Sequence, residues 1–184
     1  MHPSDNHDNA IDELADDADL ARIILGRDDK QFNRRVYLRA LFAYLEGLSF
    51  FMRRGAEELL SKRRELGKVV NPETEFLLRE EMPAIDKGGK VKYQKHRVPF
   101  ADQFSFTLRT FIEGLEMKKD PFSEHGWCDL RKALTVRDRI THPKLQADVE
   151  ISDDDLKICE SGVNWFRSLA IEISKRENWG LGRQ

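Results

Sequence analysis

Three residues near the end of one helical segment carry side chains that could cleave a phosphodiester. Arg137, Asp138 and His142 lie within a stretch of six residues. A guanidinium stays charged at physiological pH, whereas an imidazole can gain or lose a proton near neutrality. In metal-free RNA cleavage a base takes the 2′-hydroxyl proton, a cation stabilises the phosphorane, and an acid protonates the leaving 5′-oxygen. The arginine and the histidine therefore suit metal-independent attack of a 2′-hydroxyl on the adjacent phosphate.

The positions of these residues predict where their side chains point. The apolar stripe of the segment continues at position 137, so we expect Arg137 to face the core or a partner and to need an acceptor there. Asp138 precedes His142 by four residues, so its carboxylate can orient the imidazole and favour the protonated form. Pro143 biases His142 out of the helix but leaves it beside the C-terminus, where a cation is favoured.

The angular spacing of Arg137 and His142 sets a condition on a joint site. Five residues along a regular helix correspond to about 500°, so the two side chains point roughly 140° apart. One protomer would then not assemble the site alone. Two copies packed through this helix end would bring two arginines and two histidines into one cleft, so the hypothesis includes a symmetric homodimer.

The spacing of arginine and histidine has limited specificity by itself. In a chain with 18 Arg and 5 His, Arg-x-x-x-x-His is expected by chance about half a time. Requiring Asp or Asn directly after the arginine lowers the expectation to roughly one in sixteen. Placement at the end of an amphipathic helix lowers it further, so the whole arrangement is informative where the bare spacing is not.

Residues 127–143 resemble the signature helix of the HEPN superfamily, whose motif is Arg, then Asn, Asp or His, three further residues, and then His. Arg137, Asp138 and His142 match this motif position by position, and the proline that follows the histidine is a frequent variant. The motif covers only six residues, while the helical order around it covers much of the chain at lower specificity.

The resemblance implies a helical bundle that dimerises through the motif helix. Many members are metal-independent endoribonucleases of toxin–antitoxin, phage-defence or RNA-processing systems, and some are catalytically silent interaction modules. The resemblance implies Arg137 and His142 as catalytic residues, with Asp138 as an orienting or polar site residue. It implies RNA as the substrate and, in a toxin system, a cognate antitoxin as a partner. Residues 84–98 and the acidic N-terminus lie outside any shared core.

Helical spacing of apolar residues recurs along most of the chain and predicts the elements that position the site. We expect a short helix ended by Gly26, a long helix over 32–60, a short helix opened by Asn71-Pro72, helices over 100–115 and 127–140, and a last helix begun by a Ser152–Asp155 capping box. Glycines at 47 and 114, in two similar pentapeptides, mark expected close helix crossings. The predicted fold is all-α, an up-and-down bundle of five to six helices.

Residues 84–98 break this helical pattern. Asp86-Lys87-Gly88-Gly89-Lys90 is a turn composition and lacks the Walker pattern of phosphate-binding loops. We expect a small loop or β-hairpin here, inserted into the helical domain. With 184 residues and 40% hydrophobic side chains, the chain fits a single domain over 1–184, in which 1–30 form an acidic N-terminal extension and helix.

Composition predicts a cytoplasmic protein without a membrane span. No stretch approaches the roughly 18 to 20 apolar residues that a span needs, and the first residues are polar and acidic, unlike a signal sequence. Cys128 and Cys159 fall in apolar helical patterns, so we expect both to be buried and reduced. The net charge is −2, but residues 1–20 hold seven acids and no Lys or Arg, so the remaining 164 residues carry +5. A mildly basic body is compatible with a phosphate-bearing ligand.

Other charged groups are weaker candidates for function. The basic runs Arg53-Arg54, Lys62-Arg63-Arg64 and 90–97 are candidate phosphate contacts, although such runs are usually solvated faces. We interpret His96 and His125 as ordinary surface or loop histidines. Because no pair of His, Cys or acidic residues has a convincing metal-ligand spacing, we predict neither a metal nor a cofactor.

Three hypotheses of function remain open. The first is an endoribonuclease with Arg137 and His142 from two protomers, whose cleavage survives EDTA. The second is a non-catalytic dimeric interaction or regulatory protein of the same fold. The third is an RNA- or nucleotide-binding module that uses the basic segment 90–97 and loses affinity in salt. If the acidic N-terminus shields the basic body, deletion of residues 1–20 should raise RNA affinity.

Overall fold

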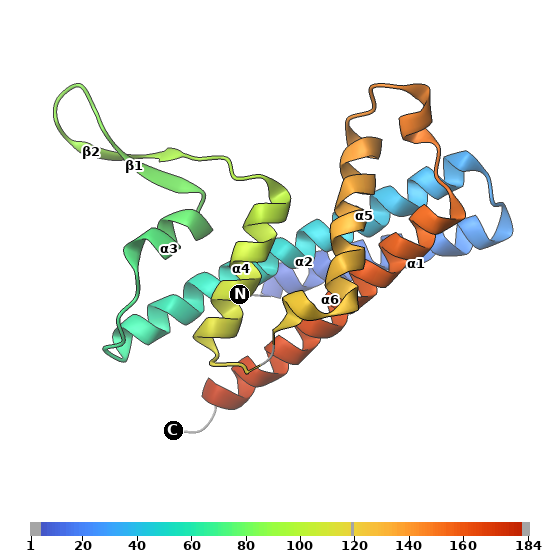
Figure 1. Cartoon of the computed structure of the whole chain (residues 1–184). Helices are drawn as coiled ribbons and strands as arrows, with labels where there is room; N and C mark the ends of the chain where they lie inside the picture. Colours follow the sequence, from blue (N-terminus) through green and yellow to red (C-terminus); the bar gives the residue numbers. More distant parts are fainter. Residues whose placement is uncertain (1–4, 119, 182–184) are drawn as a thin grey trace. The chain divides into compact units, whose positions relative to one another are not determined.

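A computed structural model of the chain describes residues 5–118 and 120–181, and the side chains of 10–118 and 120–175. The described residues form six α-helices, one two-stranded antiparallel sheet and two 3-10 turns (Figure 1). The helices are α1 Asp5–Arg27, α2 Gln31–Glu65, α3 Pro72–Leu78, α4 Phe100–Gly114, α5 His125–Thr141 and α6 Asp153–Leu181. The strands are β1 Glu81–Ile85 and β2 Val91–Lys95, and the turns are η1 Pro121–Ser123 and η2 Gln146–Val149. The predicted all-α bundle with a small hairpin is confirmed.

The chain divides into two compact units. The first consists of residues 1–50 and 120–184, and contains α1, the first part of α2, α5 and α6. The second consists of residues 51–119, and contains the rest of α2 together with α3, the hairpin and α4. That both units belong to one domain stays a prediction.

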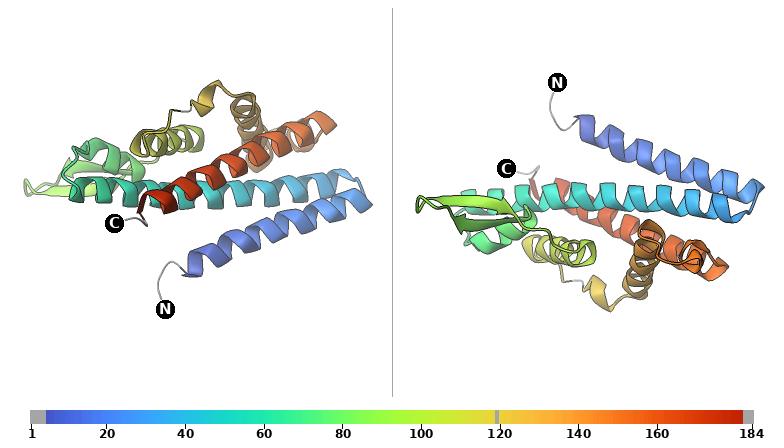
Figure 2. Two further views of the ribbon diagram at one scale, coloured as in Figure 1. Left: turned by 90° about the horizontal axis from the view of Figure 1, so that it is seen from below. Right: turned by 90° about the horizontal axis from the view of Figure 1, so that it is seen from above.

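In the first unit, α2 runs between α1 and α6 (Figure 2). A Cβ built on Gly47 of α2 would lie 2.8 Å from Leu14 of α1, so the missing side chain allows the close crossing expected at this glycine. Across the other side of α2, the Tyr37 hydroxyl donates a hydrogen bond of 2.8 Å to the Glu160 carboxylate of α6. The two flanking helices hold the N-terminal half of α2 in place.

The motif helix α5 packs against α6 through a second glycine contact. A Cβ on Gly162 of α6 would lie 2.6 Å from the Cα of Leu130 and 2.7 Å from its backbone nitrogen. Backbone atoms cannot swing aside as a flexible side chain does, so only glycine fits here. Leu130 and Ile140 of α5 and Phe166 of α6 are fully buried, and all three belong to the apolar stripes predicted for the two helices.

In the second unit, α4 lies against α2 at two further glycines. A Cβ on Gly55 would meet the ring of Phe111 at 2.8 Å, and one on Gly114 would meet Leu59 at 2.6 Å. The second of these is the other crossing expected from the sequence. The short helix α3 begins as predicted at Asn71-Pro72, where the Asn71 side chain accepts a hydrogen bond of 2.9 Å from the Glu73 backbone.

The hairpin is held at both of its ends. At the tip, the Asp86 carboxylate accepts hydrogen bonds from the backbone N–H groups of Gly88 and Lys90, at 2.8 and 2.9 Å. Gly89 completes the turn with a φ of +75°, which glycine adopts without strain. At the base, the His96 backbone donates to the Glu80 carbonyl at 2.7 Å. The strands pair from Glu81 with Lys95 through to Ile85 with Val91.

The two cysteines differ in exposure. Cys159 is buried as predicted, and burial raises the pKa of its thiol to about 12. Cys128 is exposed, so the prediction that both are buried is wrong for this residue. The buried face of this turn of α5 is formed instead by its neighbours Asp129 and Leu130. Among the described helices, none is long and apolar enough to cross a membrane.

Candidate active site

The motif occupies the last turn of α5 and its C-cap. Thr141 is the last helical residue, and His142 leaves the helix with φ −125° and ψ 57°. Its backbone N–H still donates to the Asp138 carbonyl at 3.0 Å, so His142 stays attached to the helix end. Pro143 follows and cannot continue the helix, as the sequence predicted. His142 is therefore an exposed residue whose imidazole lies at the C-terminal, negative end of the helix dipole.

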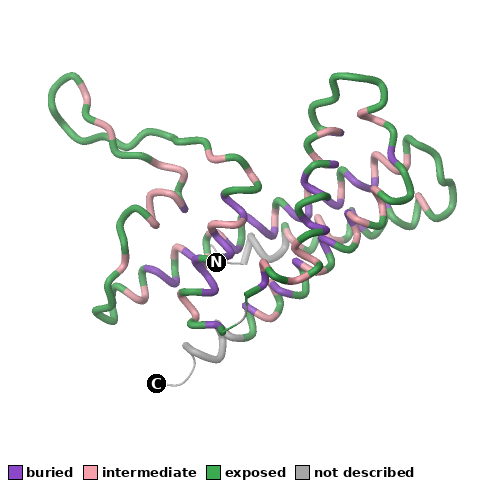
Figure 3. Tube along the Cα trace, viewed as in Figure 1, coloured by how far each residue is buried: buried purple, intermediate pink, exposed green. Residues whose placement is uncertain are grey.

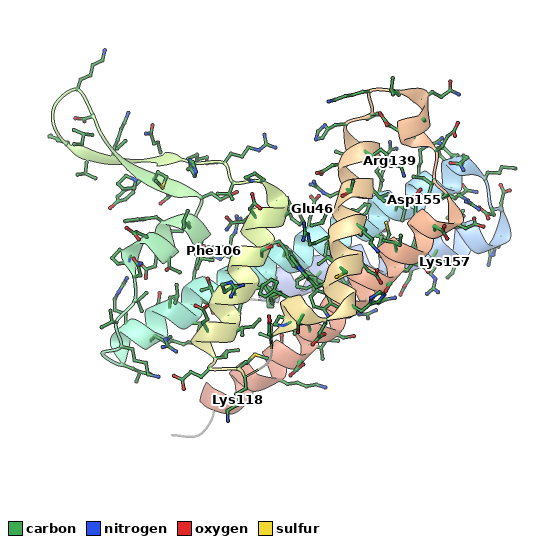
Figure 4. All side chains as sticks on the ribbon, viewed as in Figure 1. Glu46, Phe106, Lys118, Arg139, Asp155 and Lys157 are labelled. Carbon is green, nitrogen blue, oxygen red and sulfur yellow. The ribbon has the colours of Figure 1, made fainter. Side chains whose placement is uncertain are left out.

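Arg137 faces into the first unit and finds its acceptor in the same chain. Its Nε donates a hydrogen bond of 2.7 Å to Glu46 Oε1, and its Nη1 donates one of 2.8 Å to Asp138 Oδ1. The Arg137 side chain is only 19% exposed, whereas those of Glu46 and Asp138 are 46% and 68% exposed. Figure 4 places Glu46 beside α5. The sequence predicted an inward-facing arginine that needs an acceptor, but did not identify Glu46.

Asp138 lies beside the arginine rather than the histidine. Its carboxylate accepts from Arg137 Nη1, and no ion pair or hydrogen bond joins it to the His142 side chain among the described residues. The contact predicted across one helical turn is therefore not formed in this arrangement. Arg137 and Asp138 are brought together, and His142 stands apart at the helix end.

The loop that follows His142 is fixed by side chains from two helices. From α2, the Gln31 amide donates to the Ile151 carbonyl at 2.9 Å and accepts from the Ile151 N–H at 2.8 Å. Arg34 donates to the same Ile151 carbonyl at 2.9 Å, and Arg35 to the Val149 carbonyl at 3.1 Å. These contacts satisfy backbone groups at the end of η2 and just after it, and so they fix the path of the chain after the motif.

Arg139, in the last turn of α5, also holds this loop. Its guanidinium donates to the carbonyls of Ala147 and Glu150 at 3.3 and 2.8 Å, and pairs with Asp155 of α6 at 2.9 Å (Figure 4). No local pattern in the sequence marks Arg139 or the α2 side chains as site residues. Only their tertiary partners, more than one hundred residues away for the α2 group, reveal their role.

The predicted capping box opens α6. The Asp155 backbone N–H donates to Ser152 Oγ at 3.1 Å, while the Asp155 carboxylate accepts from the Ser152 backbone at 2.9 Å. Burial raises the pKa of the Asp155 carboxyl, but the hydrogen bonds from Ser152 and the charge of Arg139 together outweigh burial and lower the pKa below its usual range. Asp155 is therefore ionised at neutral pH and joins the cap of α6 to the end of α5.

A shallow cavity of about 540 Å³, widely open to solvent, lies over this fixed loop in the first unit. It is lined by Gln31, Arg34, Arg139, Ala147, Glu150, Ile151, Ser152, Asp153 and Asp155. Both arginines at its wall are already paired with carboxylates, Arg34 with Asp29 and Asp153 and Arg139 with Asp155. Neither Arg137 nor His142 lines it. The cavity therefore belongs to the scaffold that supports the motif.

A buried carboxylate at the other end of α5 also joins the two helices. Asp129, 7% exposed, accepts a hydrogen bond of 2.7 Å from Ser161 Oγ and lies 3.5 Å from His125 Nε2. In a catalytic triad the histidine lies between the serine and the acid. Here Ser161 and His125 both contact Asp129 directly, so the three residues do not have the geometry of a triad. We interpret this group as a structural link between α5 and α6.

No metal centre is found in the described part of the chain, where no three His, Cys, Asp or Glu residues are grouped closely enough to hold an ion. Comparisons with protein-family models, with curated proteins and with solved structures found no match. The motif and the local geometry at the end of α5 are therefore the observations that bear on function.

Proposed function

We propose that this protein is a metal-independent endoribonuclease that cleaves RNA by attack of the 2′-hydroxyl on the adjacent phosphate. The observation that carries the proposal is the motif itself, placed on the last turn of α5. There a mostly buried arginine and an exposed histidine occupy one helix end. The proposal includes a role as the toxin of a toxin–antitoxin or defence system, in which a cognate antitoxin would be a partner.

Each motif residue has a distinct role in this chemistry. His142 exchanges the proton, as the base for the 2′-hydroxyl or the acid for the leaving 5′-oxygen, because imidazole is the side chain that titrates near neutrality. Arg137 stabilises the charge that builds on the phosphorane. Asp138, in hydrogen-bond contact with Arg137 Nη1, is a positioning residue for the guanidinium rather than a base.

Glu46 must yield for Arg137 to reach a phosphate. The guanidinium is shared between Glu46 and Asp138, so the group of three carries one net negative charge and repels an anion. Glu46 is 46% exposed, and an exposed ion pair is worth at most about 1 kcal/mol. A phosphate that makes a bidentate contact with the arginine can replace such a partner.

The two catalytic groups are proposed to come together in a homodimer. Arg137 and the C-cap His142 are five residues apart, which corresponds to about 500° along a regular helix, so the two residues are not expected to share one face of α5. A second copy packed through the same helix end would add its own arginine and histidine to a shared cleft. Exposure of His142, Thr141 and Asp138 leaves this end of α5 accessible to such a partner.

The test measures RNA cleavage in EDTA by the wild type and by single variants. We expect His142→Ala to lower the cleavage rate by about 10² to 10⁴-fold, the range for loss of a general acid–base group. Arg137→Ala should cause a loss of about 10² to 10³-fold. Arg131→Ala, an exposed arginine on the same helix, is the matched control and should keep wild-type activity. Equal activity of all four proteins would rule out this site.

One observation favours a second candidate, a non-catalytic interaction protein of the same fold. The ion triad of Glu46, Arg137 and Asp138 is what a purely structural arginine would show. In that case the folded dimer cleaves no RNA. Arg137→Ala would then lower the free energy of unfolding and weaken the dimer, while His142→Ala would change neither.

A further inference from the structure

The second unit carries the positive charge of this protein. Residues 51–119 hold 15 basic against 11 acidic side chains, a formal charge of +4. The remaining residues hold 16 basic against 22 acidic side chains, a formal charge of −6. Within the second unit, the hairpin and its flanks, residues 81–97, contain five cations and two acids. We call residues 81–97 the hairpin arm; its charge is +3.

The lysines of the hairpin arm are not neutralised. Among the described residues, Lys87, Lys90, Lys92 and Lys95 make no ion pair, and all four are exposed. Of the two acids of the arm, Asp86 is engaged with the backbone of the turn, and Glu81 lies across the strands from Lys95 without forming an ion pair with it. Some other cations of the unit are paired, as in the contacts of Arg53 with Glu80, Arg64 with Glu75 and Lys68 with Glu116. Arg54, Lys62, Arg79 and Lys118 make no ion pair among the described residues, but they are spread over α2, the C-cap of α3 and the segment after α4 rather than grouped on one hairpin. The arm therefore presents unmatched positive charge to solvent.

Apolar and aromatic side chains are exposed on one face of the arm, the face that also carries Lys95, while Lys92 lies on the opposite face. Tyr93 is 55% exposed, and Ile85 and Val91, paired across the strands next to the turn, are 74% and 66% exposed. These three residues share one face of the hairpin, because they occupy alternate positions of the paired strands. Figure 3 shows the strands exposed along most of their length. Such a face is unusual in a free hairpin and indicates a contact surface.

The arm is nevertheless fixed to its own unit. The Tyr93 ring lies against Phe76 of α3, with 5.3 Å between ring centroids. The base is held by the ion pair of Arg53 with Glu80 at 3.0 Å and by the Glu80–His96 backbone hydrogen bond at 2.7 Å. A surface that is already ordered loses little entropy when a ligand binds.

We propose that the hairpin arm is a binding site for single-stranded nucleic acid. Lys95, on the same face of the hairpin as Tyr93, contacts the phosphate beside the stacked base, while Lys90 at the turn and Lys92 on the opposite face contact phosphates where the strand passes around the narrow arm. Tyr93 stacks on a base with the part of its ring that Phe76 leaves exposed. Phosphates account for the unmatched charge, and the flat faces of unpaired bases account for the apolar surface beside it. A duplex buries its bases, so it would use the lysines but not the tyrosine.

The identity of the strand as RNA depends on the proposed function, whereas binding of a single strand by the arm does not. The experiment therefore uses a fluorescein-labelled 20-nucleotide deoxyuridine oligonucleotide, which lacks the 2′-hydroxyl and cannot be cleaved by the proposed chemistry. Fluorescence anisotropy is measured over a range of salt concentrations for full-length wild type and variants. Failure of binding and failure of cleavage are thereby measured separately.

The principal variant replaces Lys90, Lys92 and Lys95 by glutamine. The matched control replaces Lys30, Lys132 and Lys157, which also removes three charges but from exposed lysines of the first unit near carboxylates. We expect the arm variant to bind at least about tenfold more weakly and to reduce the slope of log affinity against log salt by about two. The control variant should bind within about twofold of wild type. Equal losses of affinity in both variants would overturn the proposal, because binding would then depend only on the net charge of the protein.

Tyr93 tests the stacking contact. Tyr93→Leu should weaken binding by about five- to a hundredfold, while Tyr93→Phe, which keeps the ring, should bind as the wild type does. Because Tyr93 also contacts Phe76, the thermal midpoint of each variant is measured alongside. The lysine variant touches no core residue, so its result stands even if Tyr93→Leu unfolds. Competition by polyglutamate as effective as that by unlabelled oligonucleotide would identify an acidic protein surface as the ligand and overturn the proposal.

Discussion

The cations at the end of α5 and those of the hairpin arm differ in whether they have acceptor partners. At the end of α5, Arg137 is shared by two carboxylates and Arg139 is bound by two carbonyls and an acid. In the arm, the lysines lack carboxylate partners among the described residues. The units that contain these regions carry formal charges of −6 and +4.

This difference separates two tasks. A cation surrounded by acceptors is fixed in place, which suits a group that must meet a reacting phosphate at one position. A cation without a partner acts at longer range and attracts a polyanion from solution, at the cost of salt sensitivity. In our account the arm gathers the nucleic acid and the end of α5 supplies the chemistry. Substitutions should therefore affect stability and cleavage at the end of α5 and binding at the arm.

The largest effect on stability is expected at the contact between α5 and α6. Gly162→Ala would place a methyl group 2.6 Å from the Cα of Leu130, so the helices must separate. We expect a loss of about 1 to 3 kcal/mol in the free energy of unfolding, measured by urea denaturation. Gly26→Ala is the control, because nothing lies within 4 Å of its Cβ and alanine favours a helix. If Gly162→Ala proves as stable as Gly26→Ala, the close packing of α5 on α6 is wrong.

A smaller effect should depend on pH and on the cap of α6. The pKa of Asp155 is lowered in the folded state, so its ionisation stabilises the fold above the unfolded pKa of about 3.9. That stabilisation is lost as the pH falls through the lower folded pKa. We expect Asp155→Asn to cost about 1 to 2 kcal/mol at neutral pH and little at about pH 2. A difference between the two proteins that stays constant over this range would contradict the assignment.

The smallest effect concerns the acid that holds Arg137. Glu46→Gln keeps an acceptor for the guanidinium but removes the charge that competes with phosphate. We expect RNA cleavage at limiting substrate to rise by about two- to fivefold, in line with the value of an exposed ion pair. Glu13→Gln, an exposed acid of the same unit, is the control and should leave the rate unchanged. A large fall for Glu46→Gln would mean that the charge of Glu46 positions the arginine during catalysis.

The elements of this fold could be predicted because their signals are local. The apolar stripe of α2, the capping pair Ser152 and Asp155, and the end of α5 before Pro143 each depend on residues within a few turns of one another. The burial of Cys128 was predicted wrongly, because helical periodicity left the width of the buried face undefined and position 128 falls just outside it.

The surroundings of the candidate site could not be predicted in the same way. Glu46 is 91 residues from Arg137, and Gln31 is 120 residues from Ile151. A local pattern cannot identify such pairs, because an acid or an amide on a helix face is usually solvated and its sequence neighbours do not show whether it has a distant partner. The role of Gly162 could not be predicted either, because its contact with Leu130 forms only when α5 and α6 pack together. The motif could be found from the sequence, whereas its partners required the tertiary structure.

The most direct test of the proposed activity is the chemistry of the RNA product ends. Purified wild type and His142→Ala are incubated with a mixed-sequence RNA in EDTA, and the fragments are examined for 2′,3′-cyclic phosphate and 5′-hydroxyl ends. We predict these ends from the wild type and no cleavage by His142→Ala. Fragments that carry 3′-hydroxyl and 5′-phosphate ends, or equal cleavage by both proteins, would contradict the account.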